Sequence, residues 1–503
     1  MAPSHSYPKM PAWKATTLFV ILTFVLLVSG APEQSKVISL PLYRNKQRSI
    51  GKRDAAAVSL NYASSAFWLN ATVGTPPQQV KLQVDTGSSD AWVFGPDVCD
   101  ENDCDYYERS KSSTSSLIEE EGFLISYGDG SEVAGDYVSD VFRVGSLAVK
   151  KMEFAVATAQ SDVGTMGIMG IGFDTNEAIT DFGDKPYRNI IDSMADQGLI
   201  NSRAYSLWLN DLESGEGNIL FGGYDTEKFQ GNLTPIAIQA DEESGAITTM
   251  TIPWTSLSIT DPTQGTISLT GDNFTEAALL DSGTTLSYIP VDLYNRLASI
   301  ANVYSDSDGN SYVDCEIVQE YKGTLNVGFG GSNGTVIPVP FSEFCPPMLD
   351  VDGDSMTLNN GHDACWFGFQ PNVDFEPTIL GDTFLRSAYV VYNIDRKEIA
   401  IAPTVFGSDK TNIVEIDAPS SSDNSSWSLT SGAAVQQTAT TSTETTGVYS
   451  SMTITALFSY TPTATTTNAA ETSRGAATST GTPSSGILVS LAVSIMSLLL
   501  ALE

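Results

Sequence analysis

Val84-Asp85-Thr86-Gly87-Ser88-Ser89 returns almost unchanged 196 residues later, as Leu280-Asp281-Ser282-Gly283-Thr284-Thr285. One Asp-hydroxyl-Gly triplet is most often an ordinary turn, in which the carboxylate accepts backbone N–H groups and glycine adopts dihedral angles that other residues avoid. Here both copies follow an apolar run, and a second pair of similar segments comes after them, Gly167-Ile168-Met169-Gly170 and Thr378-Ile379-Leu380-Gly381. This repeated unit predicts two similar lobes, each of which presents one carboxylate.

The residues around the two turns have the pattern of a β-rich protein. From Tyr62 to about Pro403, short runs of β-forming residues alternate with Gly, Asn, Asp and Ser, and several runs alternate apolar and polar residues with a period of two. Helical patterns are few, at 187–197 and 291–301. We therefore expect an all-β protein with an N-terminal lobe over 54–235 and a C-terminal lobe over 236–403, each large enough for its own core.

Histidine is nearly absent, which narrows the possible chemistry. The sequence has only His5 and His362, so a Ser-His-Asp triad or a histidine-ligated zinc site would depend on His362, which lies in an ordinary loop-like Gly-His-Asp context. No CxxC or HxxxH spacing accompanies the cysteines, so neither a metal nor a cofactor is expected. Carboxylates remain as the candidate catalytic groups.

Together with their flanking motifs, the two Asp turns resemble those of the pepsin-type aspartic proteases, in particular the fungal cell-surface yapsin and candidapepsin-like branch. The resemblance covers roughly 62–403. It includes Val-Gly-Thr-Pro-Pro-Gln at 73–78, Asp-Ala-Trp-Val at 90–93, and Ile-Ser-Tyr-Gly-Asp-Gly-Ser at 125–131, which resembles the flap of the family. Ser282 replaces the Thr of the first turn but keeps the hydroxyl. The resemblance implies a bilobal pepsin-like fold, with two pseudo-symmetric β-barrel-like lobes around a central cleft.

The resemblance also implies a mechanism, in which a water held between Asp85 and Asp281 attacks a peptide bond. Two carboxyl groups that face each other at about 3 Å share a proton, for which the aspartic proteases themselves are the standard example. Tyr127 would cover the cleft, and the hydroxyls of Thr86 and Ser282 would brace the turns. The implied flap and substrate-binding set is Tyr127, Gly128, Asp129, Gly87, Gly283 and Thr284, and the implied supporting set is Thr86, Ser88, Ser282 and Trp92.

Two other classes of function stay open at this point. A catalytically silent wall glycoprotein could use the same fold, although intact Asp85, Asp281 and Tyr127 argue against it. A glycosidase also needs two carboxylates, about 5 to 9.5 Å apart, but does not require duplicated Asp-hydroxyl-Gly turns. Hydrolysis of a peptide panel compared with a glycan panel separates these classes.

The N-terminal region has the features of a secretory leader followed by a basic propeptide. Residues 1–30 carry Lys9 and Lys14 ahead of a short apolar run and predict a signal peptide, with an N-terminal membrane anchor as the alternative. Residues 31–53 predict a propeptide that ends at Lys52-Arg53, which resembles the dibasic site of kexin-type processing proteases. A disordered basic linker without an inhibitory function is the other reading.

Charge separates this leader from the rest of the chain. The sequence has 25 basic and 60 acidic residues, of which residues 1–53 hold eight and one, so residues 54–503 carry 17 basic and 59 acidic residues and a net charge of −42. Such an acidic body excludes nucleic acid as a partner. It suits an acidic medium, in which protonation reduces the self-repulsion of the carboxylates, and a basic propeptide could dock on it.

Five cysteines and five glycosylation sequons also suggest an extracellular protein. By family spacing Cys99 pairs with Cys104, and Cys315 pairs with Cys365, which leaves Cys345 free; pairing of Cys345 with Cys315 or Cys365 stays open because sequence does not fix connectivity. The predicted N-glycosylation sites are Asn70, Asn232, Asn273, Asn333 and Asn424.

Beyond Pro403 the composition changes to that of a stalk and an anchor signal. Residues 404–475 predict a Ser/Thr-rich stalk, and the following 476–503 end in an apolar run. Small residues at Gly475, a polar spacer and an apolar terminus form the pattern of a GPI-attachment signal, with Asn468 as the less well spaced alternative. We expect a monomer at the outer face of the plasma membrane or in the cell wall that acts on protein or peptide substrates.

Overall fold

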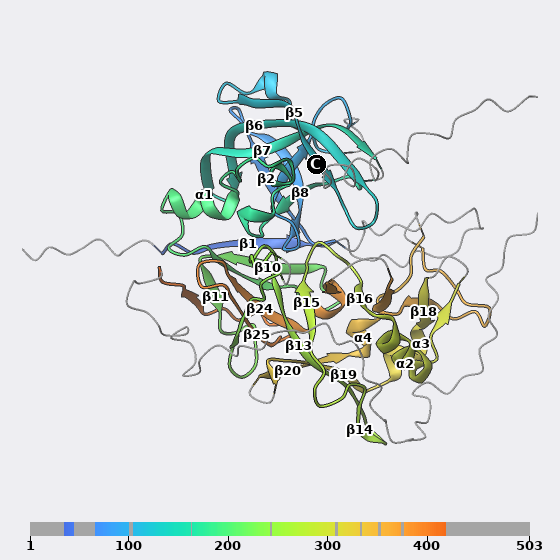
Figure 1. Ribbon diagram of the computed structural model, residues 1–503. Helices are drawn as coiled ribbons and strands as arrows, with labels where there is room; N and C mark the ends of the chain where they lie inside the picture. The colour runs from blue at the N-terminus through green and yellow to red at the C-terminus, as the bar shows by residue number, and fades with distance from the viewer. Residues whose placement is uncertain are drawn as a thin grey trace, which may run out of the picture.

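The computed structural model describes residues 35–44, 66–99, 104–161, 163–241, 244–306, 310–331, 334–350, 354–373 and 377–418. These residues form two β-rich lobes, one above the other in Figure 1, and a sheet between them. The all-β bilobal expectation is confirmed. In the described part of the chain, no helix is both long enough and apolar enough to cross a membrane.

The largest sheet has 13 strands and runs from the middle of the molecule through the upper lobe. Its order is β12-β25-β24-β9-β10-β1-β2-β3-β8-β4-β7-β6-β5. The strands of the N-terminal lobe are β2 (Trp68–Val73), β3 (Gln78–Asp85), β4 (Ala91–Phe94), β5 (Ser116–Ser126), β6 (Glu132–Val144), β7 (Leu147–Ser161) and β8 (Gly167–Gly170). The strands between the lobes are β1 (Ile38–Tyr43), β9 (Ala204–Trp208), β10 (Glu216–Phe221), β12 (Thr234–Ala237), β24 (Ala388–Asn393) and β25 (Glu398–Pro403).

The C-terminal lobe is built on an eight-stranded sheet with the path β20-β19-β13-β15-β23-β16-β22 and β14 paired to β13. Its strands are β13 (Thr251–Asp261), β14 (Gly265–Ser268), β15 (Glu276–Leu280), β16 (Ser287–Pro290), β19 (Thr324–Phe329), β20 (Thr335–Pro340), β22 (Phe369–Asn372) and β23 (Thr378–Leu380). Two small sheets join β17 (Tyr304–Ser305), β18 (Ser311–Asp314) and β21 (Ala364–Trp366), and β11 (Gly223–Asp225) and β26 (Ile413–Glu415).

Helices are short. They are α1 (Ile190–Asp196), α2 (Val291–Ala301), α3 (Cys315–Glu320), α4 (Phe341–Phe344) and α5 (Asp382–Leu385), with 3-10 turns η2 (Arg109–Lys111), η3 (Asp174–Asn176) and η4 (Ala178–Phe182). The pattern at 291–301 gives α2 over that range. The helix predicted at 187–197 corresponds to α1, which begins three residues later than predicted. It begins there because the Asn189 side chain caps the helix and accepts from the N–H groups of Ile191 (3.1 Å) and Asp192 (3.2 Å).

Each predicted repeat forms the same three-stranded unit. The strand that ends at the first Asp, β3, lies parallel to β8, and β4 pairs antiparallel with β8. In the other lobe β15 lies parallel to β23, and β16 pairs antiparallel with β23. The strand before the first Asp alternates, with Val80, Leu82 and Val84 buried and Lys81 exposed, whereas the strand before the second Asp ends in the buried run Ala278-Leu279-Leu280.

Two segments at the margins of the predicted domains take part in this fold. β1 lies within the predicted propeptide, and its alternate side chains Ile38, Leu40 and Leu42 are buried between the lobes, where the strand pairs with β10 and β2. β26 lies beyond residue 403 and pairs with β11. The domain boundaries stay predictions, and so do the signal peptide and the anchor signal, which lie outside the described residues.

Both expected disulfides are present. Cys99 bonds to Cys104, and Cys315 bonds to Cys365 with 5.0 Å between the Cα atoms. The second bridge forms because the antiparallel partners β18 and β21 hold Val313 opposite Cys365, two residues before Cys315. Cys345 is a buried free thiol.

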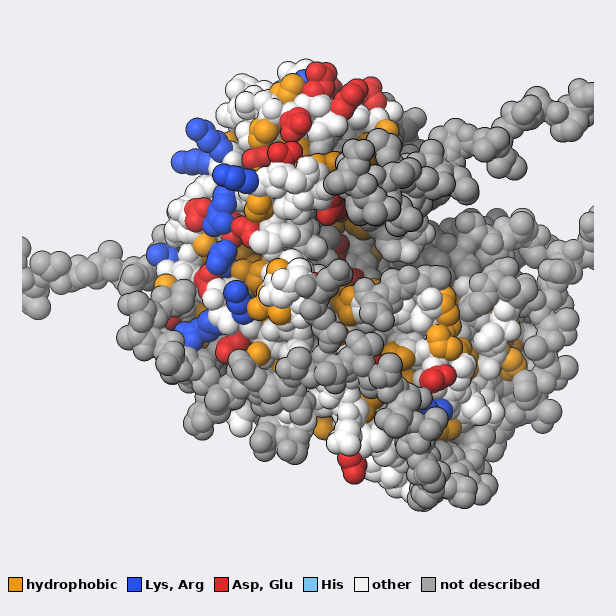
Figure 2. Space-filling model, in the orientation of Figure 1, with side chains coloured by type: hydrophobic (Ala, Val, Ile, Leu, Met, Phe, Trp, Pro, Cys, Tyr) orange, Lys and Arg blue, Asp and Glu red, His pale blue; other side chains and the backbone are white. Residues whose placement is uncertain are grey.

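Basic side chains gather on one side of the molecule in Figure 2, around α1. Two arginines there are tied to carboxylates. Arg188 contacts Asp192 (3.3 Å) and also Asp174 and Asp196, and Arg203 contacts Asp192 (3.0 Å) and Asp395 (2.6 Å). The charges of these two arginines are therefore compensated within the protein.

Candidate active site

The two Asp turns have matching hydrogen bonds. Asp85 accepts from the N–H of Gly87 (2.8 Å) at Oδ1 and from the hydroxyl of Ser88 (2.5 Å) at Oδ2. Asp281 accepts from the N–H of Gly283 (2.7 Å) at Oδ1 and from the hydroxyl of Thr284 (2.5 Å) at Oδ2. Both carboxyl groups are buried and held in a fixed orientation by donors two and three residues further along the chain.

Glycine at the third position of each turn lets the opposite carboxyl group approach. A Cβ atom on Gly283 would lie 2.3 Å from Asp85 Oδ1, and one on Gly87 would lie 2.6 Å from the carboxyl carbon of Asp281. Neither residue could be larger without separating the two carboxyl groups. The glycines are therefore required by the other lobe rather than by their own turns.

Hydroxyl groups brace the two turns against each other. The Thr86 hydroxyl donates to Leu280 O (2.7 Å) and accepts from Ser282 N (3.0 Å). The Ser282 hydroxyl donates to Val84 O (2.8 Å) and accepts from Thr86 N (3.3 Å). Each side chain thus bonds to the backbone of the other lobe, and four buried hydrogen bonds hold the two turns together.

The electrostatics of the pair favour retention of one proton. Burial and then the nearby charge of Asp85 raise the pKa of Asp281 to about 8, far above that of a free carboxyl group. Hydrogen bonds from Thr284 and Gly283 oppose this rise but do not cancel it. A pair in which one carboxyl is protonated and the other ionised can act as acid and base in one step.

The β5–β6 hairpin carries Tyr127 over this site. Its turn is closed by two backbone bonds, from Tyr127 N to Ser131 O (2.9 Å) and from Gly130 N to Tyr127 O (2.9 Å). The Asp129 carboxylate also accepts from the N–H (2.9 Å) and the hydroxyl (2.7 Å) of Ser131. The Tyr127 hydroxyl accepts from the indole N–H of Trp92 (2.7 Å). Trp92 therefore links the hairpin to the strand that follows the first Asp turn, as expected for a flap.

A family model described as eukaryotic aspartyl protease matches residues 66–404. The chain belongs to this family. It is 38% identical over 400 residues to the "Probable aspartic-type endopeptidase opsB" of Aspergillus oryzae, covering 76% of this chain and 78% of that protein. It is also 32% identical over 415 residues to Candidapepsin-1 of Candida albicans, covering 78% of this chain and 97% of that protein.

The fold of this aspartyl protease is similar to that of a solved relative. The aspartic proteinase from Irpex lacteus matches with a TM-score of 0.57 and 21% identity, over 75% of this chain and all of that one. The resemblance to pepsin-type fungal proteases is thus confirmed, and the protein is an aspartic-type endopeptidase that acts on peptides.

The other predicted positions of the protease are distributed as follows. Asn70, Asn232 and Asn273 are exposed, so all three sequons are accessible. His362 is 39% exposed and pairs with Asp314 (2.8 Å) at the start of α3. Five further predicted sites lie outside the described residues: Lys52, Arg53, Asn333, Asn424 and Gly475. In the described part of the chain, no group of three or more His, Cys, Asp or Glu residues could hold a metal ion.

Two residues near the catalytic turns have contacts that the sequence did not predict, although Asp90 belongs to the motif at 90–93. Gln83 donates its side-chain N–H to Gly283 O (2.8 Å) and adds another bond between the lobes. Asp90, at the end of the first turn, is buried and accepts from three groups of its lobe. The alternation along β3 could have placed Gln83 on the same face as Asp85, and an acid at the start of the apolar β4 run could have singled out Asp90.

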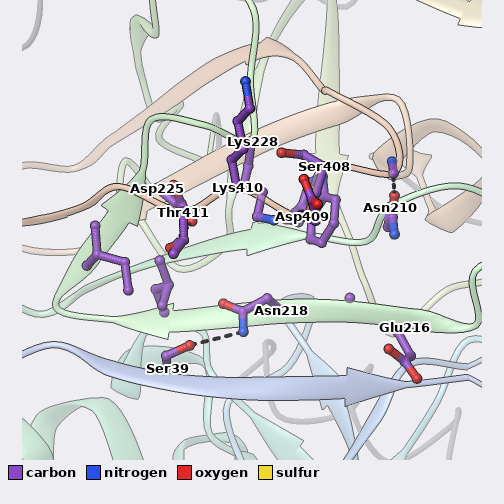
Figure 3. Close-up of a pocket in the computed structure, with 15 residues that line it drawn as sticks. Ser39, Asn210, Glu216, Asn218, Asp225, Lys228, Ser408, Asp409, Lys410 and Thr411 are labelled. Carbon is purple, nitrogen blue, oxygen red and sulfur yellow. Dashed lines mark hydrogen bonds between the residues drawn. The ribbon is translucent and has the colours of Figure 1, made fainter.

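A separate pocket of about 370 Å³ lies beside β10 and β11 (Figure 3). No catalytic residue lines it. Lys228 lies 4.0 Å from the centre of the Trp208 ring and donates to Ser408 O (2.6 Å), while Asn218 donates to Ser39 (3.1 Å). These polar groups already have partners within the protein, and the pocket is distinct from the active site.

Proposed function

We propose that this aspartic protease hydrolyses peptide bonds with a water molecule activated between Asp85 and Asp281. The ionised carboxyl of the pair takes a proton from the water, the water oxygen attacks the scissile carbonyl carbon, and the protonated carboxyl gives its proton to the carbonyl oxygen. The observation that carries this proposal is the pair of matched carboxyl groups, each held by an N–H and a hydroxyl and each facing the glycine of the other lobe.

Substrate would bind in an extended conformation under the flap, as an added strand. Gly128 is exposed at the tip of the hairpin and Tyr127 is half-buried beside it, while Gly87 and Gly283 offer backbone groups beside the carboxyls. Closure of the hairpin over the peptide would exclude bulk water from the reaction.

Peptide hydrolysis measured against pH tests this mechanism. We expect a bell-shaped profile with an acidic optimum, because activity needs one proton on the pair, together with inhibition by pepstatin and none by chelators or serine-directed reagents. Hydrolysis that is insensitive to pepstatin and peaks above neutral pH would overturn the proposal. A folded but inactive wild-type protein would favour the silent wall-protein function instead.

Localisation and processing form the second part of the proposal. The protein enters the secretory pathway through residues 1–30, is cut after Lys52-Arg53 by a kexin-type protease, and is GPI-anchored at Gly475 on the cell surface. The leader pattern, the dibasic site and the C-terminal signal support this assignment, as does the presence of two disulfides.

Mass spectrometry of the mature protein tests each of these steps. We expect Asp54 at the N-terminus and no peptide from 487–503. Replacing Lys52 and Arg53 by Ala should leave a longer, less active chain near neutral pH. An unchanged N-terminus in that variant contradicts the processing site, and intact residues 487–503 contradict the anchor.

A preference for Lys or Arg near the cut is the third part. The support is the net charge of the chain, −35, and the acids Asp129 and Glu132 in the flap. Matched basic and apolar peptides should be cleaved at different rates at low salt, and the difference should shrink as salt is raised. Equal cleavage at low salt contradicts the preference.

A further inference from the structure

Asp90 lies five residues after the catalytic Asp85 and is 1% exposed. Its Oδ2 accepts from Ala178 N (2.7 Å), and its Oδ1 accepts from the hydroxyl of Tyr187 (3.0 Å) and, at 3.5 Å, from that of Tyr137. Its backbone carbonyl accepts from Gly170 N (2.9 Å) at the end of β8. Asp90 therefore connects the catalytic turn by hydrogen bonds to the flap strand β6 and to the start of η4.

These partners belong to a hydrophobic cluster that is separate from the main core. We call it the flap-side cluster; its buried members are Trp92, Phe94, Cys99, Phe123, Val133, Tyr137, Ala155, Ala157, Ala178 and Tyr187, with Tyr127 packed against them. Tyr137 packs edge-on against Phe123 of β5 (5.5 Å) and against Tyr187 (5.7 Å). Both strands of the flap hairpin thus rest on rings that the Asp90 carboxyl orients.

A second buried acid, Glu177, completes the arrangement. It is 1% exposed, its Oε2 accepts from Tyr187 N (2.7 Å), and its Oε1 has no hydrogen-bond partner. Burial of an ionised carboxylate oxygen without a hydrogen-bond donor costs free energy, so of the two buried acids, Asp90 and Glu177, it is Glu177 that stays protonated. Asp90 has three donors and is the member that ionises first.

The opposite lobe offers an internal comparison. The position equivalent to Asp90, five residues after Asp281, is Leu286, which is buried in an apolar cluster. The three-stranded unit therefore forms equally well around a leucine. The acid at position 90 occurs only in the lobe that carries the flap, so its presence calls for an explanation other than the formation of the unit itself.

We propose that Asp90 is a positioning residue for the flap, and that the need to keep the buried Asp90 protonated beside Glu177 makes this positioning depend on an acidic medium. Asp90 does not touch the substrate. It acts through Tyr137 and Tyr187, and through Trp92 two residues along, which holds the Tyr127 hydroxyl.

The charged surroundings of the pair give the direction of the pH effect. Burial, opposed by the three hydrogen bonds, raises the pKa of Asp90 from 3.8 to about 6, and burial together with Asp90 raises that of Glu177. The pKa values of the two acids are also influenced by nearby titratable groups: Tyr137 on β6, Tyr187, Asp181 in η4, Asp174 in η3 and Asp192 in α1. Burial raises the pKa of Tyr127 in the flap, and Asp90 in turn contributes to this rise. Arg188 contacts Asp174 and Asp192 but is itself half-exposed.

The direction of the pH effect depends on how many protons the closed and the opened flap-side cluster bind. Between about pH 4 and pH 6 the folded cluster binds more protons at Asp90 than an opened cluster would, so raising the pH favours opening. Opening would hydrate the ionised carboxylate and release the rings beneath the flap. The flap would then be less well placed over the cleft, and substrate binding would weaken.

Hydrogen exchange of the intact protein between pH 4 and pH 7 tests this, with a readout independent of peptidase activity. After correction for intrinsic exchange rates, protection in 116–144 and 177–187 should fall between pH 4 and pH 6 by up to about tenfold per pH unit for each of the two acids. The C-terminal-lobe strands β19 and β20, which carry no ionisable side chain, should change much less. Equal pH slopes in the two lobes of the wild-type protein overturn the proposal, whether or not any variant folds.

Substitutions then separate charge from hydrogen bonding. Asp90→Asn is always neutral and keeps an acceptor, so it should keep wild-type KM near pH 4, reduce the exchange slope to the part that Glu177 contributes, and extend activity to higher pH by about one unit. Asp90→Leu copies the opposite lobe and deletes the bonds; it should raise KM by roughly tenfold, for about one or two lost hydrogen bonds, with a smaller change in kcat. The exposed Asp272→Asn changes net charge equally and should retain the wild-type slope.

The kinetic half of this test rests on the proposed catalytic function, whereas the exchange half does not. If the wild-type protein has no peptidase activity but shows the lobe-specific slope, the function fails and the positioning contact stands. If the enzyme is active and Asp90→Asn has the same exchange slope and pH profile as the wild type, the positioning proposal fails alone.

Discussion

The two lobes have nearly identical hydrogen bonds at the catalytic turns, but they differ in the buried residues a few positions away. At the centre, Asp85 and Asp281 have the same donors at the same spacing. A few residues away, the N-terminal lobe has the buried acid Asp90 where the C-terminal lobe has Leu286. The C-terminal lobe has its own buried acid, Asp382, one residue after Gly381, where the other repeat has Ile171.

The two buried acids are compensated in different ways. Asp90 is held by neutral donors within its lobe. Burial raises the pKa of Asp382, and Arg386 and Arg44 lower it. Arg44 follows β1, so part of the compensation in the C-terminal lobe comes from the predicted propeptide. The two lobes therefore share the catalytic turn, while each compensates its second buried acid in its own way.

Removing either catalytic carboxyl should have the largest effect. Asp85→Asn and Asp281→Asn preserve size but abolish the shared titration, so each should lose activity by on the order of 10³-fold or more, and the double variant should be little worse because the residues act as a unit. Initial rates on one peptide, with circular dichroism as the folding control, measure this. Unequal losses would show that the two turns are not functionally equivalent.

Adding one methyl group at either glycine should come next. Gly283→Ala places a Cβ atom 2.3 Å from Asp85 Oδ1, and Gly87→Ala places one 2.6 Å from the Asp281 carboxyl carbon. Displacing a carboxyl by about 1 Å can cost on the order of 10²-fold in kcat. Gly128→Ala, where nothing lies within 4 Å of the added atom, is the matched control and should fold normally. Activity in Gly283→Ala close to that of the control would contradict the close approach.

Removal of a bracing hydroxyl should have an intermediate effect on stability. Ser282→Ala deletes the bonds to Val84 O and Thr86 N, and Thr86→Ala deletes those to Leu280 O and Ser282 N. Each should lower the free energy of unfolding by about 1–3 kcal/mol, because buried backbone groups lose their partner. Denaturant unfolding measures the loss. Ser282→Thr restores the hydroxyl and should be close to wild type, whereas a similar loss in that variant would point to crowding instead.

The smallest expected effect is a pH-dependent change in stability at His362, which lies in the C-terminal lobe. The hydrogen bond and charge of Asp314 raise the pKa of His362 above 6.5, so its stabilising contribution is complete below pH 6.5 and is lost as pH rises through the raised value. His362→Gln should therefore be slightly less stable than wild type at pH 5 and equal to it at pH 9. Urea unfolding at both values decides this, and an equal difference at both would rule out the charged pair.

Local geometry within the turns could be predicted, whereas contacts between distant segments could not. Asp-x-Gly-hydroxyl sequences determine which groups bond to the carboxylate, since the partners lie two and three residues away. The two disulfides were predictable from family spacing. Gln83 bonds to a carbonyl 200 residues away and Asp90 to an N–H 88 residues away, and neither separation leaves a repeating pattern in the sequence.

β1 shows a different reason for a missed element. Its alternation of buried Ile38, Leu40 and Leu42 is that of a strand, but the segment is short and lies in a basic stretch whose composition suggested a propeptide. A strand of six residues gains its stability from partners such as β10, which is remote in sequence. Composition suggested a propeptide but did not indicate where the segment packs.

The pairing of β9 with β24 has a consequence for biosynthesis. Tyr389 donates to Ser206 across this sheet (2.9 Å), and 183 residues separate the two. At typical elongation rates the ribosome needs roughly 10–40 s to add that length of chain. For that interval the newly made β9, with its buried Tyr205 and Leu207, has one edge without its final neighbour, and an unpaired edge of this kind is prone to wrong association. The nascent enzyme is therefore expected to need chaperone protection until the last strands emerge.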